Sequence, residues 1–326
     1  MKKPSVLLSL VTADNDFQLE QAAAAQQAAR QFDAQVQVIY ADSDAIQQGE
    51  QLLEMIHGRG SRPDAIIVQP AGGTSLPQVA RAAVASGIGW VVLNREADYI
   101  TEFRSTYQVP ICSVSSDQAA IGRIQGQQMA ALLPEGGLAL YIQGPTTSPA
   151  VRERTFGMSE TKPANVVTKI IKTSNWTSDA GYRAIGSWLR LSTSRNESID
   201  LIAAQGEALA MGARKALHEQ SGGAAGWEKW SHVPFIGVDG LPQGGQKWVR
   251  DGLLAATVIV PPNAGVALEI LITAMQTGVQ PPENTFTVSL SYPQIAALTA
   301  VKAGRHKTDR LAILNANLKS LKLTKL

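Results

Sequence analysis

Polar and aromatic side chains follow many of the short apolar segments of this chain. The residues concerned are Asp14, Asn15, Phe17, Gln69, Asn94, Arg95, Glu96, Gln143, Ser174, Asn175, Trp176, Gln205, Glu207 and Asp239. Carboxylates, amides and guanidinium groups form paired hydrogen bonds with adjacent hydroxyl groups. An aromatic face covers the apolar side of a ring. Together these side chains suit a small polyhydroxylated ligand.

The motifs of known catalytic and metal sites are missing from the sequence. The four histidines are scattered, without the spacing of metal ligands. The chain has no Gly-x-Ser-x-Gly turn and no Gly-x-x-x-x-Gly-Lys-Ser/Thr loop. Residues 12–16 read Thr-Ala-Asp-Asn-Asp, not a dinucleotide-binding turn. Gly72-Gly73 is explained by a tight turn, with phosphate binding as the alternative. We therefore expect no enzyme activity, no cofactor and no metal.

Short β-branched segments alternate with Ala-rich stretches of helical periodicity. This alternation predicts parallel sheets with helices on both faces, and ligands in such sheets bind beyond the carboxyl ends of the strands. The pattern restarts at Ile111–Val114, so two successive sheets are expected. The predicted strands are Val6–Val11, Val36–Tyr40, Ala65–Gln69, Trp90–Leu93, Ile111–Val114, Leu138–Ile142, Val166–Ile171, Leu201–Ala204, Phe235–Val238, Ala255–Val260 and Phe286–Leu290.

Helices are predicted between most of these strands. The second one, at about residues 44–57, is expected to place Ile46, Leu53 and Ile56 on one face. The predicted helices cover about residues 17–32, 44–57, 75–86, 118–133, 178–191, 207–220 and 263–277.

Composition narrows the class of protein. A length of 326 residues favours two domains. The net charge of +2 is too small to indicate a nucleic-acid partner. Cys112 is the single cysteine, so an intrachain disulfide is excluded. Residues 6–11 follow two lysines as a secretion signal would, but Pro4 and the acidic turn at residues 14–16 favour a first buried strand. The basic tail after Ser291 is expected to form a solvated helix or a packed extension.

In order and spacing, several segments resemble the type I periplasmic sugar-binding proteins, the group of ribose-binding protein, and the ligand-binding part of lactose-repressor-type regulators. The resemblance covers about residues 5–290, and no single motif in it is specific. The matching segments are residues 12–17 (TADNDF), 93–95 (LNR), 114–117 (VSSD), 142–144 (IQG), 152–154 (RER), 237–240 (GVDG) and 254–258 (LAATV).

The resemblance implies a set of ligand-contacting residues, and each has a structural alternative. Asn15 and Phe17 match the first Asn and aromatic of the family; they would otherwise be a helix cap and a core contact. The alternative for Arg95 is an interlobe ion pair. The other implied contacts are Asn94, where the family has a carboxylate, Arg152 (or a surface salt bridge with Glu153 or a neighbour), Trp176 (or a buried core side chain) and Asp239 (or a turn cap).

Two departures from the family pattern affect the expected ligand. Gly206-Glu207 stands where the family often has Asn-Asp, and Val260 stands where a Gln often occurs. Each lost hydrogen bond changes discrimination by about 1–3 kcal/mol, so ribose in its usual pose is not expected. A larger ring would use the space at Gly206, with Gln205 and Glu207 as replacement partners.

The resemblance also implies an α/β fold of two doubly wound, Rossmann-like lobes. Three crossovers near residues 115–117, 260–262 and 288–291 would join them, and ligand would be trapped in the cleft by hinge closure. The expected domains are residues 1–116 with 261–289, and 117–260 with 290–326. A monomer that delivers a monosaccharide to an ABC-type importer is predicted, with a ligand-sensing module for a regulatory partner as the alternative. The compartment would be periplasmic, or cytoplasmic if the chain carries no signal.

Overall fold

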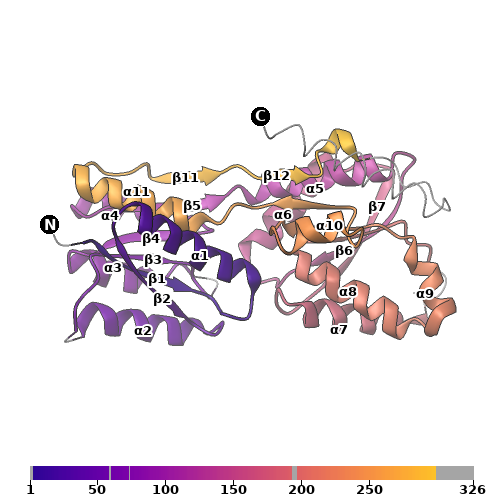
Figure 1. The fold of residues 1–326 in the computed structure, drawn as a ribbon, viewed down its shortest axis with the longest axis horizontal. Coiled ribbons are helices and arrows are strands. Elements are labelled where there is room, and N and C mark those ends of the chain that lie inside the picture. The colour runs from indigo at the N-terminus through magenta and orange to yellow at the C-terminus, as the bar shows by residue number, and fades with distance from the viewer. Residues whose placement is uncertain (1–2, 59, 73, 193–196, 299–326) are drawn as a thin grey trace. The chain divides into compact units, whose positions relative to one another are not determined.

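The computed structural model describes residues 3–58, 60–72, 74–192 and 197–298. The chain divides into an N-lobe, within Met1–Asp117 and Pro261–Val288, and a C-lobe, within Gln118–Val260 and Ser289–Leu326. Each lobe is a six-stranded sheet flanked by helices (Figure 1). The predicted fold class, two doubly wound α/β lobes, is confirmed. The lysines and arginines of the basic tail, from Lys302 onward, lie outside the described residues.

The N-lobe sheet is parallel throughout, in the order β11-β5-β4-β3-β1-β2. Its strands are β1 (Ser5–Leu10), β2 (Gln35–Tyr40), β3 (Ala65–Val68), β4 (Gly89–Leu93), β5 (Ile111–Ser116) and β11 (Asn284–Thr287). Its helices are α1 (Asp16–Gln31), α2 (Ala45–His57), α3 (Pro77–Ala85), α4 (Ile100–Thr106) and α11 (Asn263–Thr277).

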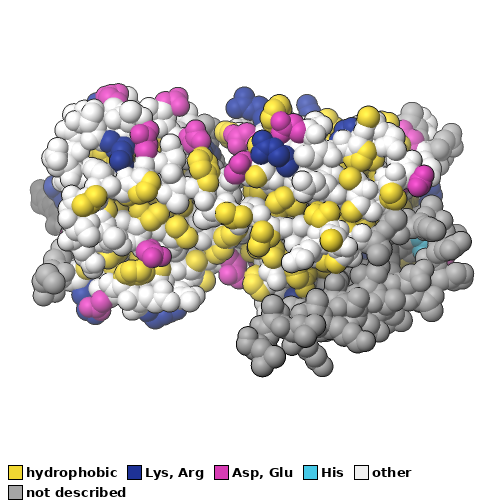
Figure 2. Space-filling view, turned by 90° about the horizontal axis from the view of Figure 1, so that it is seen from above, with side chains coloured by type: hydrophobic (Ala, Val, Ile, Leu, Met, Phe, Trp, Pro, Cys, Tyr) yellow, Lys and Arg dark blue, Asp and Glu magenta, His cyan; other side chains and the backbone are white. Residues whose placement is uncertain are grey.

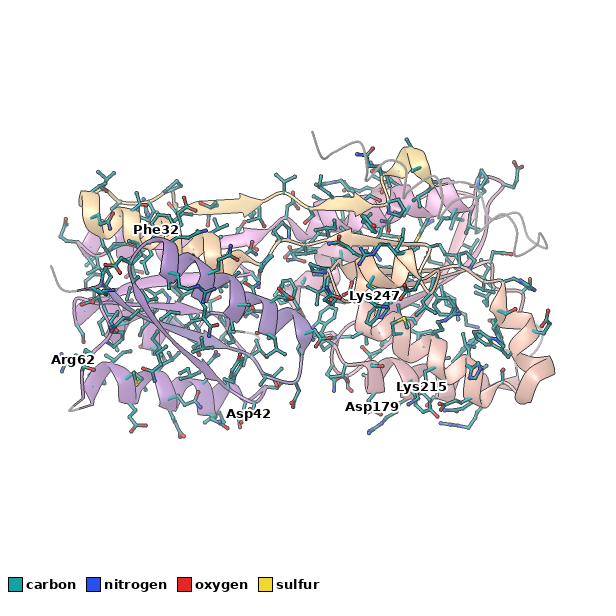
Figure 3. The ribbon with its side chains drawn as sticks, in the orientation of Figure 1. Phe32, Asp42, Arg62, Asp179, Lys215 and Lys247 are labelled. Atoms are coloured by element: carbon teal, nitrogen blue, oxygen red, sulfur yellow. The ribbon has the colours of Figure 1, made fainter. Side chains whose placement is uncertain are left out.

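Strand periodicity divides the N-lobe core between the two faces of the sheet. Val6, Leu8 and Leu10 pack with α1 and α11, whereas Leu7 packs with α2, α3 and α4. In Figure 3, Arg62 and Asp42 mark opposite ends of the strands of this sheet. Arg62 precedes β3 and marks the amino ends, and Asp42 follows β2 and marks the carboxyl ends. The loops that carry the predicted N-lobe contacts lie at the carboxyl ends of these strands, as Asp42 does.

The C-lobe sheet has the order β12-β10-β9-β8-β6-β7, with β12 antiparallel to β10. The strands are β6 (Gly137–Gln143), β7 (Val166–Lys172), β8 (Leu201–Ala204), β9 (Phe235–Asp239), β10 (Ala256–Ile259) and β12 (Leu290–Tyr292). The helices are α5 (Gln118–Leu132), α6 (Pro149–Thr161), α7 (Ser178–Leu189), α8 (Glu207–Gln220), α9 (Gly223–Ser231) and α10 (Gly245–Arg250). Leu140 and Ile142 face the core with α7 and α8, and Tyr141 faces α5 and α6.

Three expectations about individual elements are wrong. Segment Ile111–Val114 does not begin the second sheet; as part of β5 it belongs to the first, where it lies between β4 and β11. The single strand expected at Phe286–Leu290 is two strands, because β11 pairs with β5 and β12 with β10. On α2, Ile46 is 75% exposed. The polar Gln48 begins the buried stripe that continues through Leu52 and Ile56, so hydrophobicity alone misplaced the face.

On the face shown in Figure 2, acidic and basic side chains are interspersed with hydrophobic ones. This mixture agrees with a net charge of only +2. Among the described residues, none of the helices is both long enough and apolar enough to cross a membrane.

Close packing of α5 against α6 depends on glycines. A Cβ atom at Gly157 would lie 1.9 Å from the carbonyl oxygen of Ala119, and one at Gly122 would lie 2.1 Å from that of Arg154. Real Cβ atoms do not approach oxygen this closely, so the two helix backbones can touch only where these side chains are absent. This contact fixes the position of α6 relative to α5, and α6 carries Arg154.

We expect Gly157→Ala to lower the free energy of unfolding by about 1–3 kcal/mol through overpacking. The matched control is Gly49→Ala on α2, where no atom lies within 4 Å of the added Cβ. That substitution should stabilise the protein by about 0.5–1 kcal/mol through backbone entropy. Urea unfolding followed by circular dichroism measures both. Equal effects of the two substitutions would contradict the close contact of α5 and α6.

Candidate functional site

In the N-lobe, the first candidate contacts lie at the turn between β1 and α1. Asn15 is the N-cap of α1: its Oδ1 accepts a hydrogen bond from the backbone N–H of Gln18 at 3.3 Å. Phe17 follows in the first turn and is half-buried. The cap bond uses only the oxygen of the Asn15 amide, and no described residue accepts from its nitrogen. The structural alternative for Asn15 is therefore observed, and it leaves the amide nitrogen available to a ligand.

A buried glutamine holds the loop that follows β3. Gln48 is fully buried and donates from Nε2 to Ser9 Oγ and to the carbonyl oxygen of Gln69, both at 3.0 Å. Its Oε1 accepts from the backbone N–H of Ala71 at 2.8 Å. One side chain thus satisfies groups on both sides of the turn and fixes the position of Gln69.

Arg95 braces the same loop from the next one. Its guanidinium donates to the carbonyl oxygens of Gly72 at 2.8 Å, Thr74 at 3.2 Å and Pro70 at 3.4 Å. Burial lowers the pKa of Arg95 below its ordinary value, although it stays a cation at any physiological pH. These three bonds support a positioning role, and contact with a ligand stays a prediction.

Asn94 adopts an unusual backbone conformation at the end of β4, with a φ of +59°. Asparagine tolerates this left-handed region better than most residues. Its side chain is bonded at both ends: Nδ2 donates to Gln69 Oε1 at 2.9 Å, and Oδ1 accepts from Asn263 Nδ2 at 2.5 Å. These partners fix the orientation of the Asn94 amide, and contact with a ligand stays a prediction.

In the C-lobe, Trp176 lies against the loop that follows β6. A Cβ atom at Gly144 would fall 2.3 Å from the ring of Trp176, so only glycine leaves room for the ring here. A Cβ atom at Gly206 would lie 3.5 Å from the same ring and 3.8 Å from Asp239 Oδ2, which are ordinary contact distances. A Cβ atom therefore fits at Gly206, in contact with both an aromatic ring and a carboxylate.

The structure also brings Arg154 to this cluster, a residue that the sequence did not single out. Its guanidinium is 5.4 Å from the ring centroid of Trp176 and donates to Gln118 Oε1 at 2.8 Å and to the carbonyl oxygen of Gln205. Burial lowers the pKa of Arg154, and the charge of Asp239 opposes this effect. The signal that could have found it is its spacing: two residues beyond Arg152 on a helix, it must face the opposite side.

Arg152, the predicted contact, is exposed on α6. It makes no hydrogen bond or ion pair with another described residue, so an ion pair with Glu153 is not observed. An unpaired guanidinium near the start of α6 is compatible with a ligand contact, which stays a prediction. Arg154, by contrast, is buried and has its partners within the lobe.

Gln205 is fully buried and saturated by partners in its own lobe. Its Oε1 accepts from the backbone N–H of Gly144 at 3.2 Å. Its Nε2 lies 3.0 Å from Tyr141 Oη, from the carbonyl oxygen of Val151 and from Thr155 Oγ1. The side chain holds the β6–α6 loop beneath Trp176 and has no amide hydrogen to spare for a ligand.

Glu207 is likewise engaged, at the start of α8. Its carboxylate accepts from the backbone N–H groups of Gly240 and Gly245 at 2.8 Å, from that of Leu241 at 3.4 Å and from Thr257 Oγ1 at 3.3 Å. The bonds organise the loop that follows β9. These bonds hold both residues within the C-lobe, and the expectation that Gln205 and Glu207 replace missing ligand contacts stays a prediction.

Asp239 ends β9 with a φ of +117°, a conformation that costs a non-glycine residue energy. Such conformations persist where the surroundings enforce them, often at binding sites. The pKa values of Asp239 and Glu207 are both raised, mainly because burial removes the carboxyl groups from water. Repulsion from Asp239 raises the pKa of Glu207 further, whereas Arg154 partly offsets the effect at Asp239.

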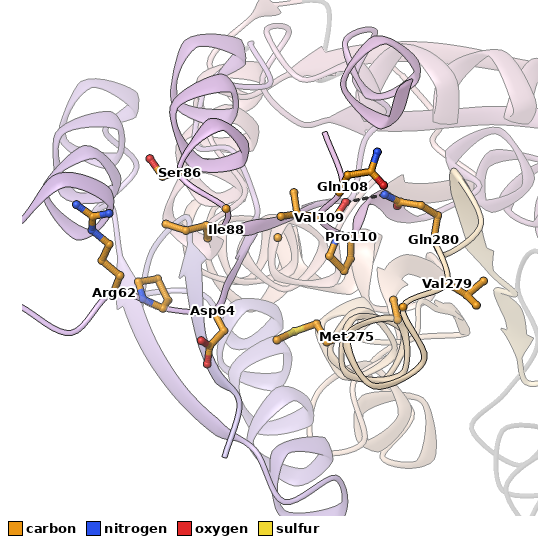
Figure 4. A pocket seen from close by; sticks show the side chains of 15 residues that line it. Arg62, Asp64, Ser86, Ile88, Gln108, Val109, Pro110, Met275, Val279 and Gln280 are labelled. Atoms are coloured by element: carbon orange, nitrogen blue, oxygen red, sulfur yellow. Dashed lines mark hydrogen bonds between the residues drawn. The ribbon is translucent and has the colours of Figure 1, made fainter. Parts of the chain in front are cut away.

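A pocket of about 470 Å³ in the N-lobe lies at the amino ends of the strands, opposite the loops described above (Figure 4). It borders the amino ends of β3, β4 and β5, with Asp64, Ile88 and Met275 in its wall. Gln280 bridges its rim by donating to the carbonyl oxygen of Val109 at 2.7 Å and accepting from the N–H of Ile111 at 3.3 Å. Parallel sheets bind ligands at their carboxyl ends, so we place the candidate site at the loops described above.

Comparison with known proteins identifies the class to which this architecture belongs. A family model described as a periplasmic binding protein domain matches residues 6–278. The chain therefore belongs to the periplasmic binding protein family, and the predicted resemblance to its type I sugar-binding members is confirmed.

Individual relatives agree with this assignment. The ribose import binding protein RbsB of Salmonella typhimurium is 24% identical over 264 residues, which cover 81% of each protein. The D-ribose/D-allose-binding protein of Pseudomonas aeruginosa is 26% identical over 263 residues, 78% of this chain and 76% of the relative. An ABC transporter periplasmic solute-binding protein of Actinobacillus succinogenes, solved with bound D-allose, has a TM-score of 0.74 at 20% identity, covering 89% of this chain and 97% of the other.

The carboxyl pair makes the stability of the unliganded protein depend on pH. Native pKa values raised above the ordinary carboxyl value of about 4 mean that the native state holds these protons more tightly than the unfolded chain. Their contribution is thus complete below about pH 4 and is lost as the pH rises toward the raised values. We expect the Tm to fall over this range, and to fall less steeply in Asp239→Asn.

Calorimetry at several pH values measures the Tm of each protein. The slope of the Tm against pH separates this effect from a change in stability that is the same at every pH. Asp251→Asn is the control, because Asp251 is an exposed carboxylate in an ion pair with Lys247. A slope in Asp239→Asn equal to that of the parent protein would contradict a raised pKa of Asp239 in the native state.

Proposed function

We propose that this protein binds a small polyhydroxylated ligand, a sugar or sugar derivative, at the carboxyl ends of its strands. The observation that carries the proposal is the group formed by Trp176, Gly206 and Asp239. An aromatic ring and a carboxylate both lie within contact distance of a Cβ atom placed at Gly206, so they face the same position. A sugar ring has an apolar face and hydroxyl edges, and it would meet both surfaces there.

The proposed mechanism is capture between the two lobes by hinge closure. The chain passes between the lobes after β5, after β10 and after β11, so three segments would have to bend together. A ligand bound at a micromolar dissociation constant supplies about 8 kcal/mol, which is ample to bias an open–closed equilibrium. We propose that the closed form then delivers the ligand to an ABC-type importer. The printed names of the relatives, a ribose import binding protein and an ABC transporter solute-binding protein, support this partner.

The proposal assigns roles to the residues at the carboxyl ends of the strands in each lobe, which form the rim of that lobe. Trp176 and Asp239 would contact the ligand from the C-lobe, with Arg152 as a further donor. Asn15 and Phe17 would contact it from the N-lobe. Arg154, Gln205 and Glu207 would hold the C-lobe contacts in position, as Gln48 and Arg95 hold those of the N-lobe. We propose no chemical conversion of the ligand, and a location in the periplasm, as in the family.

A thermal-shift screen of pentoses, hexoses, inositols and their acids tests the proposal, because a ligand that binds only the native state raises the Tm. We expect a shift with one class of polyol and its loss in Trp176→Ala and Asp239→Ala. Gly206→Ala should leave the unliganded Tm almost unchanged, since the added Cβ makes only ordinary contacts. It should nevertheless weaken binding at least ten-fold by filling the proposed ligand space.

The control is Phe156→Ala, which removes an aromatic ring that is 61% exposed on α6. It should bind as the parent protein does. Binding that survives both Trp176→Ala and Asp239→Ala would place the site elsewhere, and the absence of any shift across the screen would contradict a polyol ligand.

A further inference from the structure

Resting on the proposed function, we propose that the ligand is a sugar acid whose carboxylate lies against the amide nitrogens of Gln69 and Asn15 in the N-lobe. The argument depends on which end of each amide faces outward. That orientation follows from a continuous chain of side-chain hydrogen bonds within the lobe, which begins at a group that can only donate.

The chain of bonds starts at the backbone N–H of Val11. This group donates to Gln18 Oε1 at 3.0 Å, so the other end of the Gln18 amide must be its nitrogen. Gln18 Nε2 then donates to Gln69 Oε1 at 3.1 Å. Reversing the Gln69 amide would place two nitrogen donors against each other. The backbone N–H of Val11 thus determines the orientation of the Gln69 amide through two successive hydrogen bonds, with Gln18 between them.

Asn94 fixes the same orientation from the other side. Its Nδ2 also donates to Gln69 Oε1, at 2.9 Å, while its Oδ1 accepts from Asn263 Nδ2. Asn263 in turn accepts from Thr287 Oγ1 at 2.6 Å and donates to Ser116 Oγ at 3.2 Å. The oxygen of Gln69 therefore has two donors, which occupy both of its lone pairs, and one of the two lone pairs of Asn94 Oδ1 is already used by Asn263.

The outward-facing groups of this rim are consequently N–H donors. Both side chains use their oxygens within the lobe, and no described residue accepts from Gln69 Nε2 or from Asn15 Nδ2. Gln69 is partly exposed, so its amide nitrogen can reach a ligand. The guanidinium of Arg95 adds a positive charge beside the Gln69 loop through its bonds to residues 70–74.

The carboxylates on the loops that follow β1 and β4 are Asp14, Asp16, Glu96 and Asp98. All four are exposed, and none of their side chains is held by a hydrogen bond to a described residue. They are therefore not fixed as acceptors for a particular hydroxyl, in contrast to the fixed amides of Gln69 and Asn15.

A carboxylate matches a rim of this kind better than a hydroxyl does. It has two acceptor oxygens and no proton that needs a partner, and hydrogen bonds to a charged acceptor are about twice as strong as neutral ones. A hydroxyl in the same place can accept from one amide, but its own proton needs an acceptor, and the oxygen of Gln69 is already filled by Gln18 and Asn94. The N-lobe thus favours an acidic group, while the space at Gly206 in the C-lobe suits a ring.

Isothermal titration with matched pairs tests the proposal: glucose with glucuronate, galactose with galacturonate, and ribose with ribonate. We expect one acid to bind at least ten-fold more tightly than its neutral partner. The diagnostic variant is Gln69→Glu. Its carboxylate can still accept from both Gln18 and Asn94, so the network and the Tm should be preserved while the outward donor becomes an acceptor. Affinity for the acid should fall at least ten-fold, with less than a three-fold change for the neutral sugar.

The control is Gln35→Glu, which adds the same charge to the same lobe at an exposed position at the amino end of β2. It should leave the preference for the acid unchanged. A neutral sugar that binds as tightly as its acid, with no effect of Gln69→Glu, would overturn the sugar-acid proposal and leave polyol binding intact. Failure of every acid and every neutral sugar to bind would overturn both.

Discussion

Loops that follow parallel strands carry backbone N–H and C=O groups that no neighbouring strand can satisfy, and a partly buried loop must find other partners for them. In the N-lobe, Gln48 supplies these partners on both sides of the turn after β3. In the C-lobe, Glu207 accepts from successive N–H groups of the loop after β9. The position of every proposed contact depends on such buried polar side chains, because they fix the loops from which the contacts project.

Close backbone approach is the second requirement, and glycine meets it at chosen points. Gly157 and Gly122 allow α6 to lie against α5, which sets the position of Arg154 beneath Trp176. Gly144 then leaves room for the ring of Trp176. Helix packing thus determines the place of an aromatic side chain two loops away. Residues of α5 can therefore influence the proposed site without touching the ligand.

Much of the fold follows from patterns within the sequence. Alternating apolar strands and Ala-rich helices predict the two parallel α/β lobes, and the residues after each strand predict the rims. Sheet membership did not follow, since β5 and the split between β11 and β12 depend on pairing with distant strands. A buried polar residue also escapes a hydrophobic pattern, which is why Gln48 and the true buried face of α2 were missed.

The candidate site was predictable in its location but not in the roles of its members. Residue type marks Gln205, Glu207 and Arg95 as polar groups on a rim, yet only their hydrogen bonds show that they are occupied within their own lobes. The positive φ angles of Asn94 and Asp239 are set by the surrounding structure and leave no trace in residue type alone.

Contact between a polyol and the rim at Trp176 is the central claim of this account. The most direct measurement is a ¹H–¹⁵N NMR titration of protein labelled at tryptophan nitrogen, with the Trp176 indole signal assigned from Trp176→Phe. The account predicts that a binding sugar or sugar acid shifts this signal more than that of Trp188, which is 2% exposed in the C-lobe core. A ligand that binds and leaves the Trp176 signal unmoved would contradict it.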